Sequence, residues 1–199
     1  MRISIMDYGV GNLYSIAKGL ERAGAAVVVV TDPRRLASSD CIVFPGVGAF
    51  GAAMDALRPV REQLRDAIGR GIPTLGICLG MQILFESSEE SAGNGLGVFS
   101  GRVTKLSEGR VPQMGWNDVE FSNDRLFDGV PRGSQFYYAN SYICRPTEQV
   151  AIAETEYGEK FPAAVRKNVL CGVQFHPEKS GPPGLRLLSN FVNLAEESQ

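Results

Sequence analysis

Strand-like and helix-like segments alternate along the first half of the chain, and this alternation restricts the fold more than any other feature. Short apolar runs of strand length occupy residues 3–6, 27–30, 42–44 and 73–77. Helical spacing of apolar residues occurs between about 13 and 24 and between about 52 and 70, where Pro59 predicts a kink or two short helices. The run 27–30 is β-branched throughout, which is typical of a strand buried on both faces. Strands separated by helices predict a parallel sheet with right-handed crossovers.

The second half of the chain is mostly strand-like. Strands are expected near residues 103–106, 118–121, 136–143, 150–155, 163–166 and 170–175, and a final helix at about 184–194. A helix is expected to begin within 81–86, and the polar, glycine-rich stretch 87–97 is expected to be a mobile surface loop. No long linker divides the 199 residues, which suffice for one well-buried core. We therefore predict a single α/β domain, residues 1–199, with a mixed, mostly parallel central sheet flanked by helices.

Charge and composition argue against several functional classes. The 20 Lys and Arg residues are balanced by 22 Asp and Glu, a net charge of −2, whereas a nucleic-acid surface needs a basic field. The most apolar stretch, 23–30, is far shorter than the ~20 residues of a membrane span, and Asp7 brings charge too early for a secretory signal. We expect no nucleic acid, no membrane and a cytoplasmic location. The four cysteines are spread singly, which indicates reduced thiols and no metal site.

The glycines at positions 46, 48 and 51 match the Gly-x-Gly-x-x-Gly pattern of dinucleotide-binding turns, directly after a predicted strand. That use also needs a carboxylate at the end of the next strand to bind the ribose, and Cys78 occupies that position. Simple tight turns remain an alternative for these glycines. The sequence therefore gives little support to NAD binding, and no cofactor is expected.

Cys78 is the strongest candidate for a nucleophile. Gly76 and Gly80 flank it where a buried strand is expected to turn into a helix, which is the sequence pattern of a nucleophile elbow. The alternative for a free cysteine is a small buried side chain, and this suits the other three cysteines, which lie in or beside apolar strand patterns. At a strand–helix junction, the backbone N–H groups of the helix start can stabilise a thiolate.

The single histidine, His176, is the one imidazole available to such a nucleophile. Pro177 holds it in an extended conformation, in which Glu178 lies on the same side of the chain. The carboxylate would fix the imidazole tautomer and leave the other ring nitrogen to take the thiol proton. A histidine on a strand is more often structural, but its spacing to Glu178 favours a Cys-His-Glu triad. One histidine and scattered cysteines make no metal-ligand set.

An acyl-transfer nucleophile also needs an oxyanion hole. The N–H of Leu79, just after the nucleophile, is one expected donor. A second is expected from the turn that contains Gly46, Val47 and Gly48. Glycine on both sides of Val47 makes a peptide flip inexpensive, so the hole can be completed when a partner stabilises one state.

Five segments of the chain resemble the triad-type glutamine amidotransferases, and within them the glutaminase subunits of imidazole glycerol phosphate synthase. The elbow and the His-Pro-Glu sequence mark the wider family, while the first segment and Met-Gly-Trp-Asn narrow the resemblance. The segments are 7–13 (DYGVGNL), 44–50 (FPGVGAF), 76–82 (GICLGMQ), 112–117 (PQMGWN) and 176–180 (HPEKS).

The resemblance implies a flavodoxin-like fold and hydrolysis of L-glutamine to glutamate and ammonia through a thioester on the cysteine. It also implies a heterodimer, in which ammonia passes to a (β/α)₈ cyclase subunit of imidazole glycerol phosphate synthase, in histidine biosynthesis. The positions that match the family's glutamine pocket are Gly46, Gln82, Tyr138 and Ser141. Those that match its cyclase-facing side are Asn12, Met114, Trp116, Asn117 and Lys179.

The chain departs from the family at Gln113 and Asn140, where relatives usually have histidine. These positions belong to the subunit interface and the pocket wall, not to the triad. Core filling is the alternative for Met114 and Trp116, but residues 112–117 show neither strand alternation nor a helical stripe, which favours an apolar patch on a loop. Two other functions remain open: a glutaminase subunit of another synthase, for anthranilate or pyridoxal phosphate, and a non-catalytic regulatory subunit.

Overall fold

The computed structural model describes residues 1–9 and 13–198, in which five α-helices and fourteen β-strands are formed. The helices are α1 (Leu13–Arg22), α2 (Phe50–Leu57), α3 (Arg61–Gly69), α4 (Leu79–Gln82) and α5 (Gly181–Glu196). The strands of the first half are β1 (Arg2–Met6), β2 (Ala26–Val30), β3 (Cys41–Phe44), β4 (Thr74–Ile77), β5 (Ser87–Ser88) and β6 (Ser91–Asn94). Those of the second half are β7 (Gly101–Lys105), β8 (Gln113–Asp118), β9 (Glu120–Phe121), β10 (Gln135–Asn140), β11 (Tyr142–Pro146), β12 (Ala151–Tyr157), β13 (Glu159–Lys167) and β14 (Leu170–Val173).

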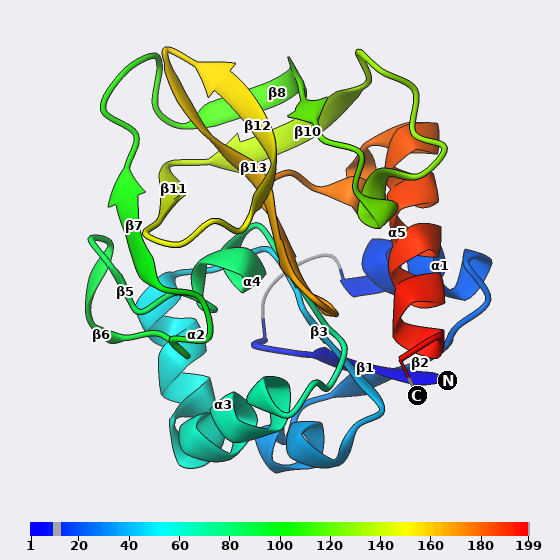
Figure 1. Cartoon of the computed structure of the whole chain (residues 1–199). Coiled ribbons are helices and arrows are strands. Elements are labelled where there is room, and N and C mark those ends of the chain that lie inside the picture. The colour runs from blue at the N-terminus through cyan, green and yellow to red at the C-terminus, as the bar shows by residue number, and fades with distance from the viewer. Residues whose placement is uncertain (10–12, 199) are drawn as a thin grey trace.

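An eight-stranded mixed sheet in the order β2-β1-β3-β4-β14-β13-β12-β9 forms the centre of the fold (Figure 1). The first five strands of this order are parallel to one another, and β13, β12 and β9 continue the sheet with antiparallel pairings. The predicted mixed α/β sheet is therefore confirmed. Its parallel half places the carboxyl ends of β1, β3, β4 and β14 at one edge.

Helices cover both faces of the parallel half, because alternate side chains of each strand point to opposite faces. Val43 of β3 packs in one apolar core with residues of α1 and α5, which lie side by side in Figure 1. Its neighbours Ile42 and Phe44 pack in a second core with residues of α2 and α3. The two cores account for the continuous apolar runs of the central strands.

Strand β2 corrects one expectation. It is at the edge of the sheet, paired with β1 alone, so of its residues only Val30 is buried and Val29 is 45% exposed. The prediction of a strand buried on both faces is wrong because the residue types of an edge strand and a central strand are alike here, and only the strand order distinguishes them.

The helical stretch with Pro59 behaves as predicted. A 3₁₀ turn, Arg58–Val60, separates α2 from α3, because proline cannot donate the hydrogen bond that a continuous helix needs. The helix expected within 81–86 is shorter, since α4 ends at Gln82.

Two smaller sheets contain segments that were predicted to be loops or a single strand. The expected loop 87–97 contains β5 and β6, which form a four-stranded sheet with β7 and β11. The expected strand 136–143 is interrupted at Ser141, so that β10 pairs with β8 and β11 pairs with β7. The segment 112–117, expected to be a loop, is largely the strand β8.

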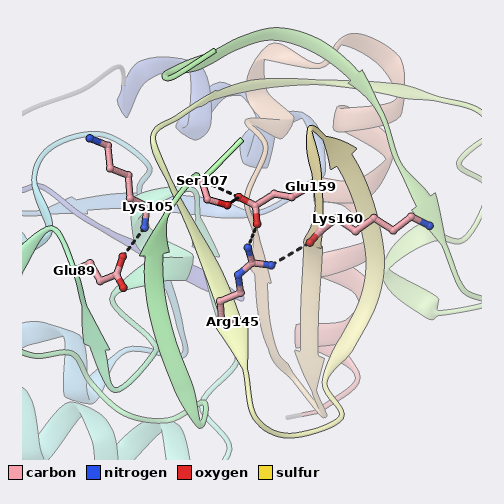
Figure 2. A network of polar contacts seen from close by, with 6 residues as sticks. All are labelled: Glu89, Lys105, Ser107, Arg145, Glu159 and Lys160. Atoms are coloured by element: carbon pink, nitrogen blue, oxygen red, sulfur yellow. Dashed lines mark hydrogen bonds and ion pairs between the residues drawn. The ribbon is translucent and has the colours of Figure 1, made fainter. Parts of the chain in front are cut away.

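A network of polar contacts joins the four-stranded sheet to β13 (Figure 2). Glu159 accepts hydrogen bonds from the backbone N–H and the hydroxyl of Ser107, at 2.8 and 2.9 Å, and forms an ion pair with Arg145. Burial opposes ionisation of this carboxyl, but these donors outweigh it and hold the pKa of Glu159 below its usual value. On the other side of β7, the backbone N–H of Lys105 donates to Glu89 at 3.0 Å. None of the described helices is both long and apolar enough to cross a membrane.

Candidate active site

The carboxyl ends of three neighbouring parallel strands converge on one cavity. Gly46 lies just beyond β3, Cys78 follows β4, and His176 lies just beyond β14. In an open parallel sheet, the loops at this edge form the usual ligand crevice. The cavity has a volume of about 270 Å³. The residues that line it are Gly46, Val47, Gly48, Cys78, Leu79, Gln82, Glu90, Pro112, Ala139, Asn140, Ser141, Tyr142, His176 and Lys179.

Cys78 occupies a strained turn between β4 and α4. Its φ of 50° and ψ of −105° lie outside the regions that residues with a Cβ normally adopt. Two glycines make the turn possible: a Cβ on Gly80 would lie 2.0 Å from the carbonyl oxygen of Phe44, and one on Gly76 would lie 2.4 Å from that of Gly80. The strained turn holds the thiol at the cavity wall, as the predicted nucleophile elbow requires.

His176 and Glu178 form a buried pair. The imidazole Nδ1 lies 2.8 Å from Glu178 Oε1, and the two side chains are 1% and 3% exposed. Glu178 approaches the ring from a 3₁₀ turn, Pro177–Lys179, rather than from an extended strand as predicted. The backbone N–H of His176 donates to Tyr137 O at 2.8 Å, which fixes the start of this turn.

The charge on His176 is set by three opposing influences. Burial lowers the pKa of the imidazole, but hydrogen bonds with the side chains of Cys78 and Glu178 outweigh burial and raise it to about 10. Both contacts therefore favour the imidazolium form, in which both ring nitrogens carry protons. The imidazole, the carboxylate and the thiol predicted as a triad are thus brought together in series.

The absence of a side chain at Gly46 allows Cys78 and His176 to lie close to this turn. A Cβ at this position would lie 3.0 Å from Cys78 Cβ and 3.0 Å from His176 Cε1, so a larger residue would press on both side chains. Next along the turn, Gly48 has a φ of +118°, a conformation that glycine adopts without strain. Packing at Gly46 and conformation at Gly48 are sufficient reasons for these glycines, as in the tight-turn alternative.

The predicted pocket residues do not all reach the cavity. Gln82 and Ser141 line it, as do Val47, Gly48 and Leu79 of the expected oxyanion hole. Tyr138 does not, because its side chain is fully buried in the core against Phe161 and Phe175. The expectation for Tyr138 fails because Ala139, the next residue of β10, lines the cavity, and successive residues of a strand point to opposite faces.

Glu90 and Gln174 are two residues of the site that the sequence reasoning missed. Glu90 lines the cavity, and its Oε2 accepts a hydrogen bond from the backbone N–H of Phe50, at the start of α2, at 2.7 Å. It belongs to the hairpin that was predicted to be a loop. Gln174 is fully buried, and its Nε2 donates to Cys78 Sγ at 3.5 Å. The signal for Gln174 was its position two residues before His176, on the same side of an extended segment.

The predicted interface residues have different surroundings. Met114 and Trp116 are 67% and 55% exposed and lie two residues apart on β8. Lys179 is exposed, with Nζ 5.5 Å from the centre of the Tyr137 ring. Asn117 instead holds β8 to β12, because its Nδ2 donates to Thr155 Oγ1 at 3.0 Å and to the backbone of β12. The interface prediction for Asn12 lies outside the described residues.

Gln113 and Asn140 are cross-strand neighbours between β8 and β10, and both are buried. Within the described part of the chain, Gln113 Nε2 and Oε1 and Asn140 Oδ1 have no hydrogen-bond partner. Among the same residues, no group of three or more His, Cys, Asp or Glu side chains could hold a metal ion.

A larger cavity, of about 540 Å³, lies at the opposite edge of the sheet, where β4 and β14 begin. Its charged lining residues are Arg65, Asp66, Arg70 and Lys167. None of its lining side chains is a thiol, an imidazole or a hydroxyl, so it offers no pairing of a thiol or hydroxyl nucleophile with a histidine base. The candidate chemistry therefore lies in the smaller cavity.

The sequence of the chain matches a known protein family. The sequence profile of the family described as glutamine amidotransferase class-I matches residues 4–194. The chain belongs to the glutamine amidotransferase class-I family. Within it, the chain is 45% identical over 195 residues to the imidazole glycerol phosphate synthase subunit HisH of Methanocaldococcus jannaschii, covering 96% of this chain and 99% of the relative. It is 46% identical over 199 residues to the subunit HisH of Thermococcus kodakarensis, covering 96% and 100%.

Solved structures share the fold of this glutamine amidotransferase at lower identity. A crystal structure titled glutamine amidotransferase has a TM-score of 0.76 and 21% identity, with 98% of each chain covered. A chain of PurLQS from Thermotoga maritima has a TM-score of 0.77 and 20% identity, covering 96% of this chain and 97% of that one. These likenesses show the α/β fold alone.

Proposed function

We propose that this chain is the glutaminase subunit of an imidazole glycerol phosphate synthase, hydrolysing L-glutamine to glutamate and ammonia. The observation that carries the chemistry is that Cys78 and His176 line one cavity and that the Glu178 carboxylate contacts the His176 imidazole. The choice of synthase rests on relatives of that name, which are 45–46% identical over nearly the whole chain.

Each member of the triad has one role in the proposed reaction. The Cys78 thiolate attacks the side-chain amide carbon of glutamine, and the His176 imidazolium gives its proton to the nitrogen that leaves as ammonia. Neutral His176 then takes a proton from water, whose oxygen attacks the thioester carbon, and the sulfur leaves as thiolate with glutamate as the product. Glu178 holds the Nδ1–H throughout and stabilises the imidazolium.

The oxyanion that forms in both steps needs fixed donors. The backbone N–H of Leu79 is one, by the geometry of the elbow, and the Val47–Gly48 peptide is the proposed second. Since Gly46 and Gly48 flank Val47, this peptide can change orientation at low cost, and partner binding can select the productive state.

The cavity wall supplies the contacts that would orient glutamine. The Glu90 carboxylate is available to the α-ammonium of the substrate, while Gln82 and Ser141 provide neutral polar groups. Lys179 lies at the same wall and complements an α-carboxylate. The pair of opposite charges matches a zwitterionic amino acid.

The ammonia would pass to a (β/α)₈ cyclase subunit. Met114 and Trp116 form an exposed apolar patch, and the Trp116 ring contacts Tyr137, whose own ring is 6.5 Å from that of His176. The patch is thus continuous with the active site, as an ammonia-transferring interface requires. A cytoplasmic location is part of the proposal, supported by four free, buried cysteines.

The test is a glutaminase assay with and without the cyclase subunit and its ligand. We expect low activity alone, strong stimulation by the cyclase, and loss of at least about a thousandfold in Cys78→Ala. Cys41→Ala removes a buried thiol remote from the cavity and serves as the control. Activity that survives in Cys78→Ala contradicts the mechanism, and stimulation by an anthranilate or pyridoxal phosphate synthase instead of the cyclase contradicts the assignment.

A further inference from the structure

A chain of side-chain amides leads from a backbone carbonyl to the nucleophilic sulfur. Gln82 Nε2 donates to Tyr142 O at 3.0 Å and lies 3.3 Å from Gln174 Oε1, to which it also donates. Gln174 Nε2 donates to Cys78 Sγ at 3.5 Å. The residues come from α4, from β11 and from the segment after β14, so that this chain of hydrogen bonds links three separate elements and ends at the sulfur.

The carbonyl at the start of this chain fixes the orientation of both amides. A backbone carbonyl can only accept, so Gln82 must present its nitrogen to Tyr142 O. The second hydrogen of that nitrogen faces Gln174, which must therefore present its oxygen. The Gln174 nitrogen is left facing the sulfur, because reversing either amide would place two donors or two acceptors against each other.

Packing does not explain an amide at position 174. Gln174 is fully buried and Gln82 is 5% exposed, and burying an amide is unfavourable unless its hydrogen bonds are made. A methionine or leucine would fill the same volume without that requirement. The polar chain therefore points to a role at the sulfur.

We propose that Gln174 is a further catalytic residue, whose amide N–H, oriented by Gln82 and Tyr142, stabilises the thiolate form of Cys78. This inference rests on the proposed glutaminase function. An amide hydrogen is not transferred to sulfur, so the donor stabilises the negative charge without neutralising it, whereas His176 can give its proton away.

Two features explain why a second, non-titrating donor is needed. Cys78 Sγ also lies 3.8 Å from Ala139 O, which can accept from a thiol but repels a thiolate. In addition, His176 loses its proton to ammonia during acylation, and the thiolate must be regenerated as the thioester is hydrolysed. Gln174 can donate to the thiolate both before acylation and when the thioester is hydrolysed.

The experiment compares the pH dependence of alkylation by iodoacetamide in wild type and Gln174→Met, with peptide mapping to follow Cys78. Because alkylation needs no glutamine, it separates the state of the sulfur from substrate binding. A hydrogen bond to a charged group corresponds to roughly a ten- to hundredfold change, so the midpoint should rise by about one to two pH units. In complex with the cyclase, kcat should fall by a similar factor, with KM little changed.

Control variants keep the inference testable. Gln63→Met makes the same change on the exposed face of α3 and should leave the midpoint and kcat unchanged. Gln174→Glu keeps the shape but places a carboxylate at the sulfur, so its midpoint should rise further, and it serves if the methionine variant fails to fold. A folded Gln174→Met with a midpoint within about 0.3 pH units of wild type overturns the inference. The glutaminase function is kept separately if Cys78→Ala fails to hydrolyse glutamine in complex with the cyclase.

Discussion

His176 is the single histidine of the chain, so its imidazole can be followed by NMR without assignment. Its pKa is raised to about 10, above the ~6.5 of an unfolded histidine. As an individual group it therefore stabilises the fold fully below about pH 6.5, and this contribution is lost as the pH rises toward 10. The physical cause is the pair of side chains, Cys78 and Glu178, whose hydrogen bonds favour the charged imidazole.

The charge on His176 should respond to each of these contacts. We expect Glu178→Gln to lower the imidazole pKa by at least about one unit, because it replaces a carboxylate with a neutral amide. Cys78→Ala should also lower it, by removing the other hydrogen bond. The ¹³Cε1–H shift of the single imidazole, recorded from pH 5 to 11, gives the midpoint, and equal midpoints in wild type and Glu178→Gln would contradict the arrangement.

Some individual residues of the candidate site could be predicted from the sequence, and others could not. Cys78, His176 and Glu178 could be selected because their residue types and local spacing are typical of a nucleophile, a base and a carboxylate that orients the base. Tyr138 and Gln174 could not be placed, because the direction of a side chain depends on where each strand starts and breaks. The chain lines the cavity from Ala139 to Tyr142, across the break between β10 and β11 at Ser141, and no local signal marks that break.

At the scale of elements, the junction of β4 and α4 depends on close backbone contacts. Gly80 lies against Phe44 at the end of β3, and Gly76 lies against Gly80 itself. The positive φ of Cys78 is strained, and the surrounding backbone must hold it in place. The elbow is therefore a property of β3, β4 and α4 together.

A methyl group at position 80 should damage this junction. In Gly80→Ala, the added Cβ would lie 2.0 Å from a backbone oxygen, so β3 or α4 must shift, and we expect about 2–4 kcal/mol of destabilisation. Glutaminase activity should fall with it. Thermal or urea unfolding gives the stability change.

The matched control is Gly69→Ala, at the end of α3, where an added Cβ meets nothing within 4 Å. We expect this substitution to be neutral or slightly stabilising, because alanine has the higher helix propensity. If both variants unfold at the same denaturant concentration, the close approach at Gly80 does not control the junction.

The elements predicted wrongly share one physical feature. Strands β5 (Ser-Ser), β6 (Ser-Ala-Gly-Asn) and β8 (Gln-Met-Gly-Trp-Asn-Asp) are rich in small and polar residues, and their sequences do not show the pattern that indicates a strand. Strands β5 and β8 are formed because partners farther along the chain pair with them, β7 with β5 and β10 with β8, and β6 then pairs with β5 in a hairpin. Local composition cannot report such pairing.

At the scale of the whole molecule, the exposed apolar patch of Met114 and Trp116 lies beside the active-site edge of the sheet. In Figure 1, β8 and β10 lie together at the top of the view, away from α3. Tyr137 contacts Trp116 on one side and His176 on the other. A partner that covers this patch would therefore also approach the catalytic groups.

Removing the indole should weaken the assembly more than the fold. We expect Trp116→Ala to raise the Kd for the cyclase subunit by roughly ten- to a hundredfold, as for an aromatic residue at the centre of an interface. The unfolding temperature of the isolated chain should change little, because the ring is 55% exposed. Calorimetric titration with the cyclase and a thermal melt measure the two effects.

The comparison variant is Val29→Ala, which removes an exposed apolar side chain from the edge strand β2. Its affinity for the cyclase should match that of wild type. Should Trp116→Ala bind the cyclase as tightly as Val29→Ala does, the patch does not belong to the interface.

The sequence by itself determined the alternating α/β core and the break at Pro59, and it selected Cys78, His176 and Glu178 as the proposed nucleophile, base and orienting carboxylate. All of these follow from periodicity, proline stereochemistry or the chemistry of neighbouring residues, which act over short distances along the chain. Only the tertiary structure decided that Gln174 donates to the sulfur, that Tyr138 is in the core and that β8 is a strand. Those outcomes depend on burial and strand pairing between segments far apart in sequence, where the free energy comes from contacts that no local pattern contains.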